Sequence, residues 1–166
     1  DMRNFTAFFE ANQVAMRDDP RSDECQAFTG PHVAVDDFIG TGGQFIKMRD
    51  RVLTTCRRFP ITHIAVVCIQ EQALKRLTTE GFVVLALEVR PKAVSYLAAK
   101  TGRDVNELYP VYDAMEAKAA PMPRAKRGWD KSEALVTLKS TPNNTLPIFW
   151  TEGKTKWPAP FPRPKR

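Results

Sequence analysis

Short apolar runs along the chain alternate with segments in which apolar residues recur at helical spacing. The runs over residues 63–70 and 81–88 are apolar on both of the faces that a strand presents. Uninterrupted runs of this kind, rich in β-branched residues, are typical of parallel strands covered on both sides. Val33 and Val35 favour a further strand over residues 32–36, which ends in two acidic residues. We therefore expect three strands in the first half of the chain.

Helical patterns separate these three strands. A stripe of apolar residues runs from about residue 41 to residue 57, and a shorter pattern covers residues 71–79. Strand, helix, strand, helix, strand is the order of consecutive βαβ units with right-handed crossovers. The pattern therefore predicts an α/β fold, a parallel sheet flanked by helices.

The segments on either side of this sheet have a different character. Before it, Phe5, Phe8, Phe9, Ala11 and Val14 recur at helical spacing and predict a helix over residues 4–16, which a polar loop follows. After it, we expect a helix over residues 91–100 and a second helix that opens at the capping box 104–107 and kinks or restarts at Pro110. We then expect a basic loop over 121–129, a strand over 134–139, and a polar loop that runs into an aromatic segment over 140–150.

These changes of pattern divide the chain into three regions. We expect an α/β core over residues 1–90, a C-terminal subdomain over residues 91–157, and a basic, proline-rich tail over residues 158–166. With 166 residues, of which 43% are hydrophobic, the chain can build a core of ordinary size. It begins with Asp1 instead of Met, so a fragment or a processed form is expected.

Composition excludes several classes of protein. No apolar run reaches the ~18 residues that a membrane-spanning helix needs, and no secretory signal is visible. The three cysteines form no C-x-x-C pair, which argues against a disulfide framework or a structural zinc site. We therefore expect reduced thiols in a cytoplasmic protein without a membrane contact.

The formal net charge of +6 is concentrated late in the sequence. Arg124, Lys126 and Arg127 precede a tail over residues 154–166 in which basic residues alternate with proline and aromatic residues. Such a region attracts phosphorylated molecules, a partner protein or nucleic acid. The alternative is a solvated terminus without a ligand.

The loop that follows the first predicted strand is suited to phosphate. Gly40, Gly42 and Gly43 allow the backbone to curl tightly, so that consecutive N–H groups can converge on an anion. Thr41 adds a hydroxyl group, and the next helix begins here with the positive end of its dipole, Gln44 lying in its first turn. No G-K-[ST] or G-x-G-x-x-G pattern is present, which disfavours a P-loop or a dinucleotide site. An ordinary glycine-rich βα turn remains the alternative.

Two carboxylates, Asp36 and Asp37, immediately precede this loop. They would repel a bare phosphate, so they favour a ligand that also carries hydroxyl groups or a Mg²⁺ ion. A phosphate, a ribose diol and a metal-bound diphosphate in a row describe phosphoribosyl diphosphate (PRPP). The loop therefore predicts a PRPP site or a site for a nucleotide 5′-phosphate.

The stretch over residues 33–44 resembles the PRPP loop of type I phosphoribosyltransferases, in which apolar residues, two acids, two apolar residues and a run of Thr and Gly follow one another. His32 and Gln44 are departures from that pattern. The resemblance implies that Asp36 and Asp37 are catalytic, hold the ribose hydroxyls and contact Mg²⁺ indirectly. It assigns the 5′-phosphate to Gly40 and residues 41–44, and it implies a transfer or release of the phosphoribosyl group at C1.

The resemblance is incomplete on the amino-terminal side. Only 35 residues precede Asp36, and we identify no diphosphate loop and no catalytic flap among them. Two functions therefore stay open, a phosphoribosyltransferase or a non-catalytic subunit that senses PRPP or a nucleotide in a larger assembly. The sequence also resembles bacterial phosphoribosyltransferase-like proteins, some of which are found near defence genes, and this implies an antiviral effector role. Type I relatives imply a homo-oligomer.

The family usually recognises the base in a small variable subdomain, the hood, for which residues 91–157 are the candidate. Amide side chains can read a base edge, aromatic rings can stack on a base, and cations can meet a diphosphate. The alternative for residues 140–150 is a turn that leads into a buried aromatic segment. The candidate contacts to the base or diphosphate are Arg90, Lys126, Arg127, Asn143, Asn144, Phe149 and Trp150.

Overall fold

The computed structural model describes residues 21–27, 29–30, 32–56, 58–136, 144–151 and 157–162. Outside the described residues lie the helix predicted over residues 4–16, Asn143, and residues 163–166 of the basic tail. Within the described part of the chain, no helix has the length and apolar character needed to cross a membrane.

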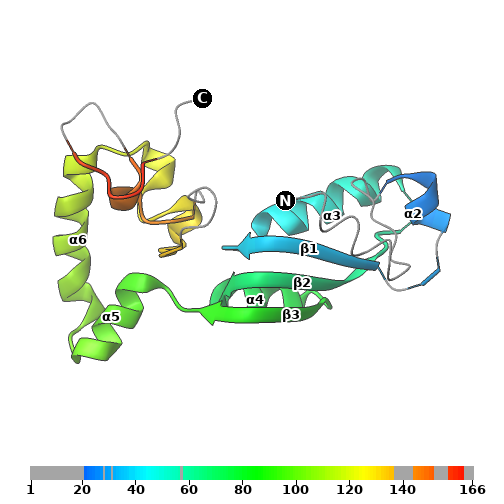
Figure 1. The fold of residues 1–166 in the computed structure, drawn as a ribbon, viewed down its shortest axis with the longest axis horizontal. Helices are drawn as coiled ribbons and strands as arrows, with labels where there is room; N and C mark the ends of the chain where they lie inside the picture. The colour runs from blue at the N-terminus through cyan, green and yellow to red at the C-terminus, as the bar shows by residue number, and fades with distance from the viewer. Residues whose placement is uncertain are drawn as a thin grey trace.

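The centre of the fold is a three-stranded parallel sheet in the order β1-β2-β3 (Figure 1). Its strands are β1 (His32–Ile39), β2 (Ile61–Gln70) and β3 (Val83–Arg90). A short helix, α2 (Asp23–Ala27), precedes β1. The parallel α/β arrangement predicted from the apolar runs is therefore confirmed.

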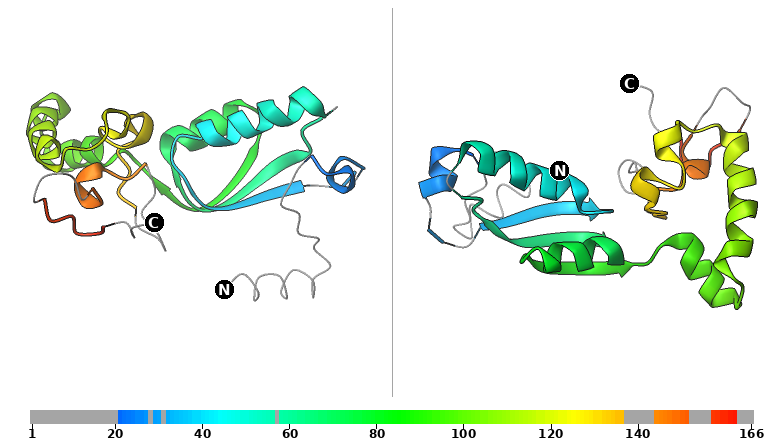
Figure 2. Two further views of the ribbon diagram at one scale, coloured as in Figure 1. Left: turned by 90° about the horizontal axis from the view of Figure 1, so that it is seen from above. Right: turned by 180° about the vertical axis from the view of Figure 1, so that it is seen from behind.

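Two helices form the crossovers of this sheet, α3 (Gly43–Thr55) and α4 (Glu71–Thr79). Both lie on the same side of the sheet, as Figure 2 shows. This follows from handedness, because each right-handed crossover adds the next strand in the same direction. The main core lies between these helices and the sheet, and it includes Ile46, Ile64, Val66, Ile69, Leu77 and Phe82.

The opposite side of the sheet differs from the expectation of strands covered on both faces. Val35 is 68% exposed on β1, and Leu85 and Leu87 are 61% and 80% exposed on β3. The described residues therefore cover one face only. The apolar runs give the correct strands, but they do not identify which segment covers the second face.

The boundary between β1 and its loop also differs from the prediction. The ladder continues past the two carboxylates, because Phe38 pairs with Cys68 and Ile39 pairs with Ile69. Strand β1 therefore ends at Ile39, three residues later than predicted, and α3 begins at Gly43. The loop is reduced to residues 40–42, and Asp36 and Asp37 lie inside the strand.

The C-terminal module lies beyond the carboxyl ends of the strands (Figure 1). It begins with α5 (Ala93–Thr101) and α6 (Val105–Ala119). Asp104 caps α6 as predicted by accepting a hydrogen bond from the backbone N–H of Asn106, at 2.9 Å. Helix α6 continues through Pro110, so the predicted restart at that residue is wrong.

Three short 3-10 helices and a second core complete the module. The helices are η1 (Pro123–Ala125), η2 (Trp129–Lys131) and η3 (Pro147–Phe149). The second core includes Val94, Tyr112, Ala119, Leu146 and Ile148. Of the strand predicted over residues 134–139, the described residues show only one isolated bridge, between Ala134 and Thr145.

Candidate functional site

The loop between β1 and α3 lies at the carboxyl edge of the sheet, where ligands of parallel sheets bind. Gly42 has a φ of 70° and is the N-cap of α3, with no side chain capping the helix. A Cβ at this position would lie 3.3 Å from Cγ of Leu77, so the loop is pressed against α4. Glycine is needed here both for the left-handed backbone and for the close approach.

The loop and the first turn of α3 contain hydrogen-bond donors. The hydroxyl oxygen of Thr41 accepts the backbone N–H of Gly43, at 3.4 Å. No other described residue accepts a hydrogen bond from the backbone N–H of Gln44 or Phe45, in the first turn of α3. N–H groups without a partner among the described residues, together with the positive end of the helix dipole, favour an anion at this point.

A cation that sequence reasoning missed lies beside the loop. Arg76 extends from α4, and its Nη1 donates to the carbonyl oxygen of Thr41, at 3.4 Å. The same Nη1 lies 3.3 Å from the position of a Cβ on Gly43. The apolar pattern of α4 identifies Leu77 as buried and Arg76 as its neighbour, but it does not tell which loop the arginine reaches.

The two carboxylates leave β1 on opposite sides, because consecutive strand residues alternate. Asp36 pairs with Val66, which faces the helices, whereas Asp37 shares the side of exposed Val35. The backbone N–H of Asp37 donates to Oδ1 of Asp36, at 2.8 Å. The pair therefore brackets the end of the strand, with one carboxylate on each face.

The local environment makes it costly to ionise Asp36. Partial withdrawal from water raises the pKa of Asp36 above the ordinary carboxyl range, and the neighbouring charge of Asp37 adds to this shift. Backbone N–H groups of Asp37 and Phe38 oppose the shift without cancelling it. A cation or a hydroxyl donor that binds Asp36 would therefore relieve an existing electrostatic cost.

Asn144 connects the loop to the C-terminal module. A Cβ on Gly40 would lie 2.3 Å from Cγ of Asn144, so the amide side chain rests directly on the loop. Nδ2 of Asn144 is 3.5 Å from the backbone carbonyl oxygen of Trp129. The backbone carbonyl oxygen of Asn144 accepts a hydrogen bond from the hydroxyl of Ser132, at 2.7 Å. The structure thus places one predicted base contact at the loop, although its role stays a prediction.

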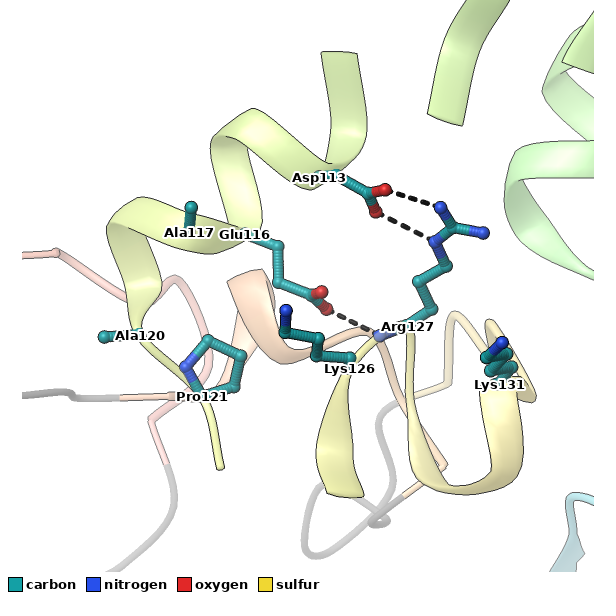
Figure 3. A pocket seen from close by; sticks show the side chains of 8 residues that line it. All are labelled: Asp113, Glu116, Ala117, Ala120, Pro121, Lys126, Arg127 and Lys131. Carbon is teal, nitrogen blue, oxygen red and sulfur yellow. Dashed lines mark hydrogen bonds and ion pairs between the residues drawn. The ribbon is translucent and has the colours of Figure 1, made fainter. Parts of the chain in front are cut away.

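The other cations predicted to meet the ligand do not contact the loop. Arg90 ends β3, two strands away from β1, and pairs with Glu88 at 3.2 Å. Lys126 and Arg127 line a hollow of about 440 Å³ in the C-terminal module, together with Asp113 and Glu116 (Figure 3). This hollow carries both signs of charge, and the loop residues are not among those that line it.

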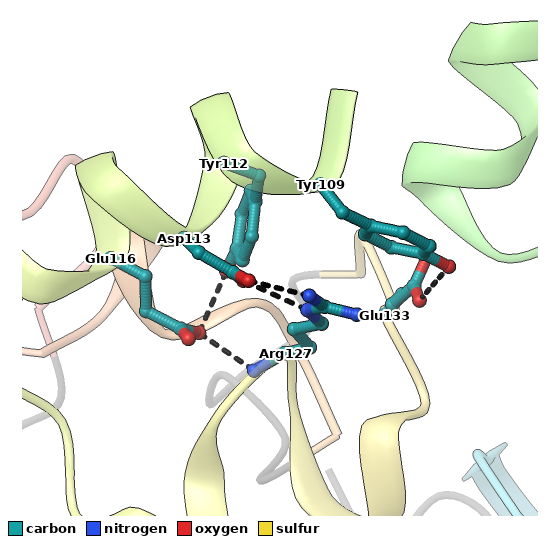
Figure 4. A network of polar contacts seen from close by, with 6 residues as sticks. All are labelled: Tyr109, Tyr112, Asp113, Glu116, Arg127 and Glu133. Atoms are coloured by element: carbon teal, nitrogen blue, oxygen red, sulfur yellow. Dashed lines mark hydrogen bonds and ion pairs between the residues drawn. The ribbon is translucent and has the colours of Figure 1, made fainter. Parts of the chain in front are cut away.

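Arg127 is already committed to contacts within the module (Figure 4). Its Nε and Nη2 donate to the two carboxylate oxygens of Asp113, at 2.8 and 2.5 Å, and this pairing lowers the pKa of Asp113. Its guanidinium also lies over the ring of Tyr109, 3.9 Å from the centroid. A bidentate, stacked arginine holds the module together, and it would have to leave these contacts to reach a diphosphate.

Glu116 anchors the same network from α6. One carboxylate oxygen accepts both the hydroxyl of Tyr112, at 2.9 Å, and the backbone N–H of Arg127, at 2.7 Å. Glu116 is almost fully buried, and this burial raises the pKa of its carboxyl group. The network fixes the chain between α6 and η2, and therefore the position of the segment that carries Trp129.

The aromatic candidates, Phe149 and Trp150, make contacts within the C-terminal module. Phe149 packs against the second core, and its ring lies 6.4 Å from that of Phe161. Nε1 of Trp150 donates to the carbonyl oxygen of Thr145, at 2.8 Å. These contacts agree with a turn that leads into a packed aromatic segment, and Asn143 lies outside the described residues.

Mg²⁺ is bound by oxygen ligands, and the carboxylates of Asp36 and Asp37 are the candidates at the loop. Across the described ranges, no three or more His, Cys, Asp or Glu residues gather into a metal site. Two exposed carboxylates fit Mg²⁺ nevertheless, because this ion keeps several waters and is commonly bound through substrate phosphates. Asp36 and Asp37 would hold it together with the ligand.

A glycine loop between a parallel strand and a helix, preceded by two carboxylates, defines a phosphoribosyltransferase-like α/β domain. The comparison with known families agrees with this class. The chain belongs to the PRTase-CE family, whose sequence profile matches residues 6–163. No curated protein matches the chain.

Proposed function

We propose that this domain binds PRPP or a nucleotide through its 5′-phosphate and transfers or releases the phosphoribosyl group at C1. The single observation behind this proposal is the order of groups at the end of β1: two carboxylates, a glycine loop of three residues, and an uncapped helix N-terminus. The phosphate would bind over residues 40–44, and the ribose hydroxyls would meet Asp36 and Asp37.

The charges around the loop support this orientation. The guanidinium of Arg76 lies on the side of Gly43, where a phosphate would need a positive charge. The carboxylates lie three and four residues before Gly40, which separates the acceptors from the anion. A ligand with a phosphate at one end and hydroxyl groups at the other therefore suits the loop better than inorganic phosphate.

The proposed reaction breaks the bond between C1 of the ribose and its leaving group. With PRPP the leaving group is diphosphate, and a nitrogen of the incoming base forms the new bond to C1. Positive charge develops on the ribose ring during this step, and the fixed carboxylates of Asp36 and Asp37 would stabilise it electrostatically. Bound Mg²⁺ would supply neutralisation of the diphosphate charge.

Diphosphate release tests the catalytic proposal. The protein is incubated with PRPP, Mg²⁺ and a panel of nitrogen bases, and diphosphate is measured with time. We expect release that falls at least ~100-fold in Asp36→Asn/Asp37→Asn, in line with the loss of an electrostatic stabiliser. The matched control, Asp50→Asn/Glu107→Gln, removes two exposed charges elsewhere and should retain activity. Equal release by both variants would contradict the assignment.

A second function, sensing without transfer, is supported by the contact between Gly40 and Asn144. A ligand on the loop would press on Asn144, which is bonded to Ser132 and lies beside Trp129. Ligand binding at the loop would therefore shift residues of the C-terminal module. Binding of PRPP without any diphosphate release, together with a change in Trp129 fluorescence, would favour this function over catalysis.

A further inference from the structure

A third carboxylate lies at the loop between β1 and α3, and it comes from the C-terminal module. Oδ2 of Asp130, in η2, is 4.0 Å from the position that a Cβ on Gly43 would occupy. The same position is 3.3 Å from Nη1 of Arg76 and 3.5 Å from Oγ1 of Thr41. A carboxylate, a guanidinium group and a hydroxyl group therefore converge, from three different segments, on the space beside Gly43.

This space exists because residue 43 has no side chain. Gly42 has a positive φ, whereas Gly43 is not among the glycines that do, so a left-handed backbone does not require glycine at residue 43. The Cα–Cβ bonds of a helix tilt toward its N-terminus, so the space beside Gly43 belongs to the N-terminal end of α3. The helix dipole and the charge of Arg76 favour an anion there. The carboxylate of Asp130 is such an anion.

This carboxylate has no partner of its own. Asp130 is exposed, and no described residue donates a hydrogen bond to its carboxylate or forms an ion pair with it. Its position comes from the backbone, because Asp130 has a φ of 54° and a ψ of 31°, and Lys131 has a φ of 53°. Residues other than glycine rarely adopt a left-handed backbone, which persists only where surrounding contacts hold it.

Contacts on both sides of η2 provide this support. Arg127, three residues before Asp130, donates two hydrogen bonds to the carboxylate of Asp113 on α6. Two residues after Asp130, the backbone carbonyl oxygen of Ser132 accepts a hydrogen bond from Nε2 of Gln70, at 2.8 Å. Gln70 is the last residue of β2 and is buried. The segment is thus fixed to α6 and to the edge of the sheet, which holds Asp130 at the loop.

We propose that the carboxylate of Asp130 competes with the phosphate of a ligand for the N-terminal end of α3, so that the C-terminal module regulates access to the loop. This inference rests on the proposed function, because it takes the loop as the phosphate site. A phosphate beside Gly43 would meet a like charge at close range, so binding requires the carboxylate to move away. A change that loosens the module would release Asp130 and favour the ligand.

Calorimetric titration with ribose 5-phosphate tests the competition, because this probe carries a 5′-phosphate and ribose hydroxyls without a diphosphate. Asp130→Asn removes the charge, and asparagine tolerates a left-handed backbone. Asp50→Asn, which removes an exposed charge from α3, is the matched control. We expect Asp130→Asn to bind at least ~10-fold more tightly than the wild type, since a like charge at close range is removed, and the control to bind like the wild type.

Salt concentration separates direct competition from repulsion at longer range. The Debye length falls from ~10 Å at ~0.1 M salt to ~3 Å at ~1 M salt. We expect the ratio of the affinities of Asp130→Asn and the wild type to persist at the higher concentration, because two anions that need the same space compete at any ionic strength. A ratio that falls to one would overturn the proposal. If Asp130→Asn fails to fold, Asp130→Gly replaces it, because glycine also accepts this backbone.

Loosening the module tests the regulation. Asp113→Ala removes the partner of Arg127, so it should raise the affinity for ribose 5-phosphate in the wild-type background and leave it unchanged in Asp130→Asn. An equal effect in both backgrounds, or none in either, would refute the link to the module.

The titrations also separate this inference from the proposed function. Equal binding by the wild type and Asp130→Asn would overturn the competition and leave the phosphate site intact. Weaker binding by Asp130→Asn would also overturn it, because the carboxylate would then be a ligand contact. Absence of binding to both proteins would contradict the proposed function and this inference with it.

Discussion

The contact between Gly40 and Asn144 gives the sharpest structural prediction, because a single methyl group probes it. A Cβ at residue 40 would lie 2.3 Å from Cγ, 2.4 Å from Nδ2 and 2.8 Å from Cβ of Asn144. Ordinary contact begins at 3.4 Å, so the loop and the amide must separate by about 1 Å. We expect Gly40→Ala to lower the free energy of unfolding by ~1–3 kcal/mol, the usual cost of overpacking.

Removing the opposing side chain should relieve this cost. Asn144→Gly removes all three clashing atoms, so Gly40→Ala should cost less than ~0.5 kcal/mol in that background, whereas Asn144→Ala keeps the Cβ and should relieve only part of the cost. Gly128→Ala is the matched control. A Cβ there would lie 2.2 Å from the backbone oxygen of Asn144, which Asn144→Gly does not remove.

Urea denaturation of the single and double variants measures these coupling energies. The same variants should be compared for PRPP binding, because a displaced loop also misplaces its N–H groups. If Gly40→Ala has the same cost with and without the side chain of Asn144, the two residues do not touch in solution. The link between the loop and the C-terminal module would then be refuted.

Four further predictions concern Glu116, Gly42 and Asp36. Glu116→Ala should lower the free energy of unfolding by ~2–4 kcal/mol, since it leaves Tyr112 and a backbone N–H unpaired, whereas Glu116→Gln keeps an acceptor. Burial raises the pKa of Glu116, so wild-type stability should fall as pH rises from the ordinary carboxyl range through this raised pKa; denaturation of Glu116→Gln should show a smaller fall. Gly42→Ala should cost more than Gly81→Ala in the same assay, because both glycines have positive φ but only Gly42 faces a side chain, and equal costs would contradict this. Because the pKa of Asp36 is raised, ligand affinity measured against pH should begin to fall on acidification above the ordinary carboxyl range, and this fall should be absent in Asp36→Asn.

The strands and crossover helices were predictable because local patterns determine them. The continuous apolar run that becomes β2 and the helical pattern that follows it place the boundary at Gln70 and Glu71, where the structure has it. The end of β1 was misplaced because two adjacent acids resemble a strand end. Pairing of Phe38 with Cys68 extends the ladder, and that pairing depends on the neighbouring strand.

The surroundings of the loop could be predicted only in part, because they come from distant segments. The glycines and carboxylates are consecutive in sequence, so their pattern was visible. Arg76 and Asn144 reach the loop from α4 and from the C-terminal module, and no local spacing encodes those contacts. Arg127 was expected near a diphosphate because of its charge, but the structure pairs it with Asp113 through the packing of α6.

Calorimetric titration of PRPP with Mg²⁺ tests the central proposal most directly. The wild-type protein, Asp36→Asn/Asp37→Asn and the control Asp50→Asn/Glu107→Gln are titrated under identical conditions. We predict that the wild type and the control bind alike, and that the loop variant loses more than tenfold in affinity, about 1.4 kcal/mol. Binding of equal strength to all three proteins, or no binding of PRPP or a nucleoside monophosphate to the wild type, would contradict the assignment of this loop as a phosphoribosyl site.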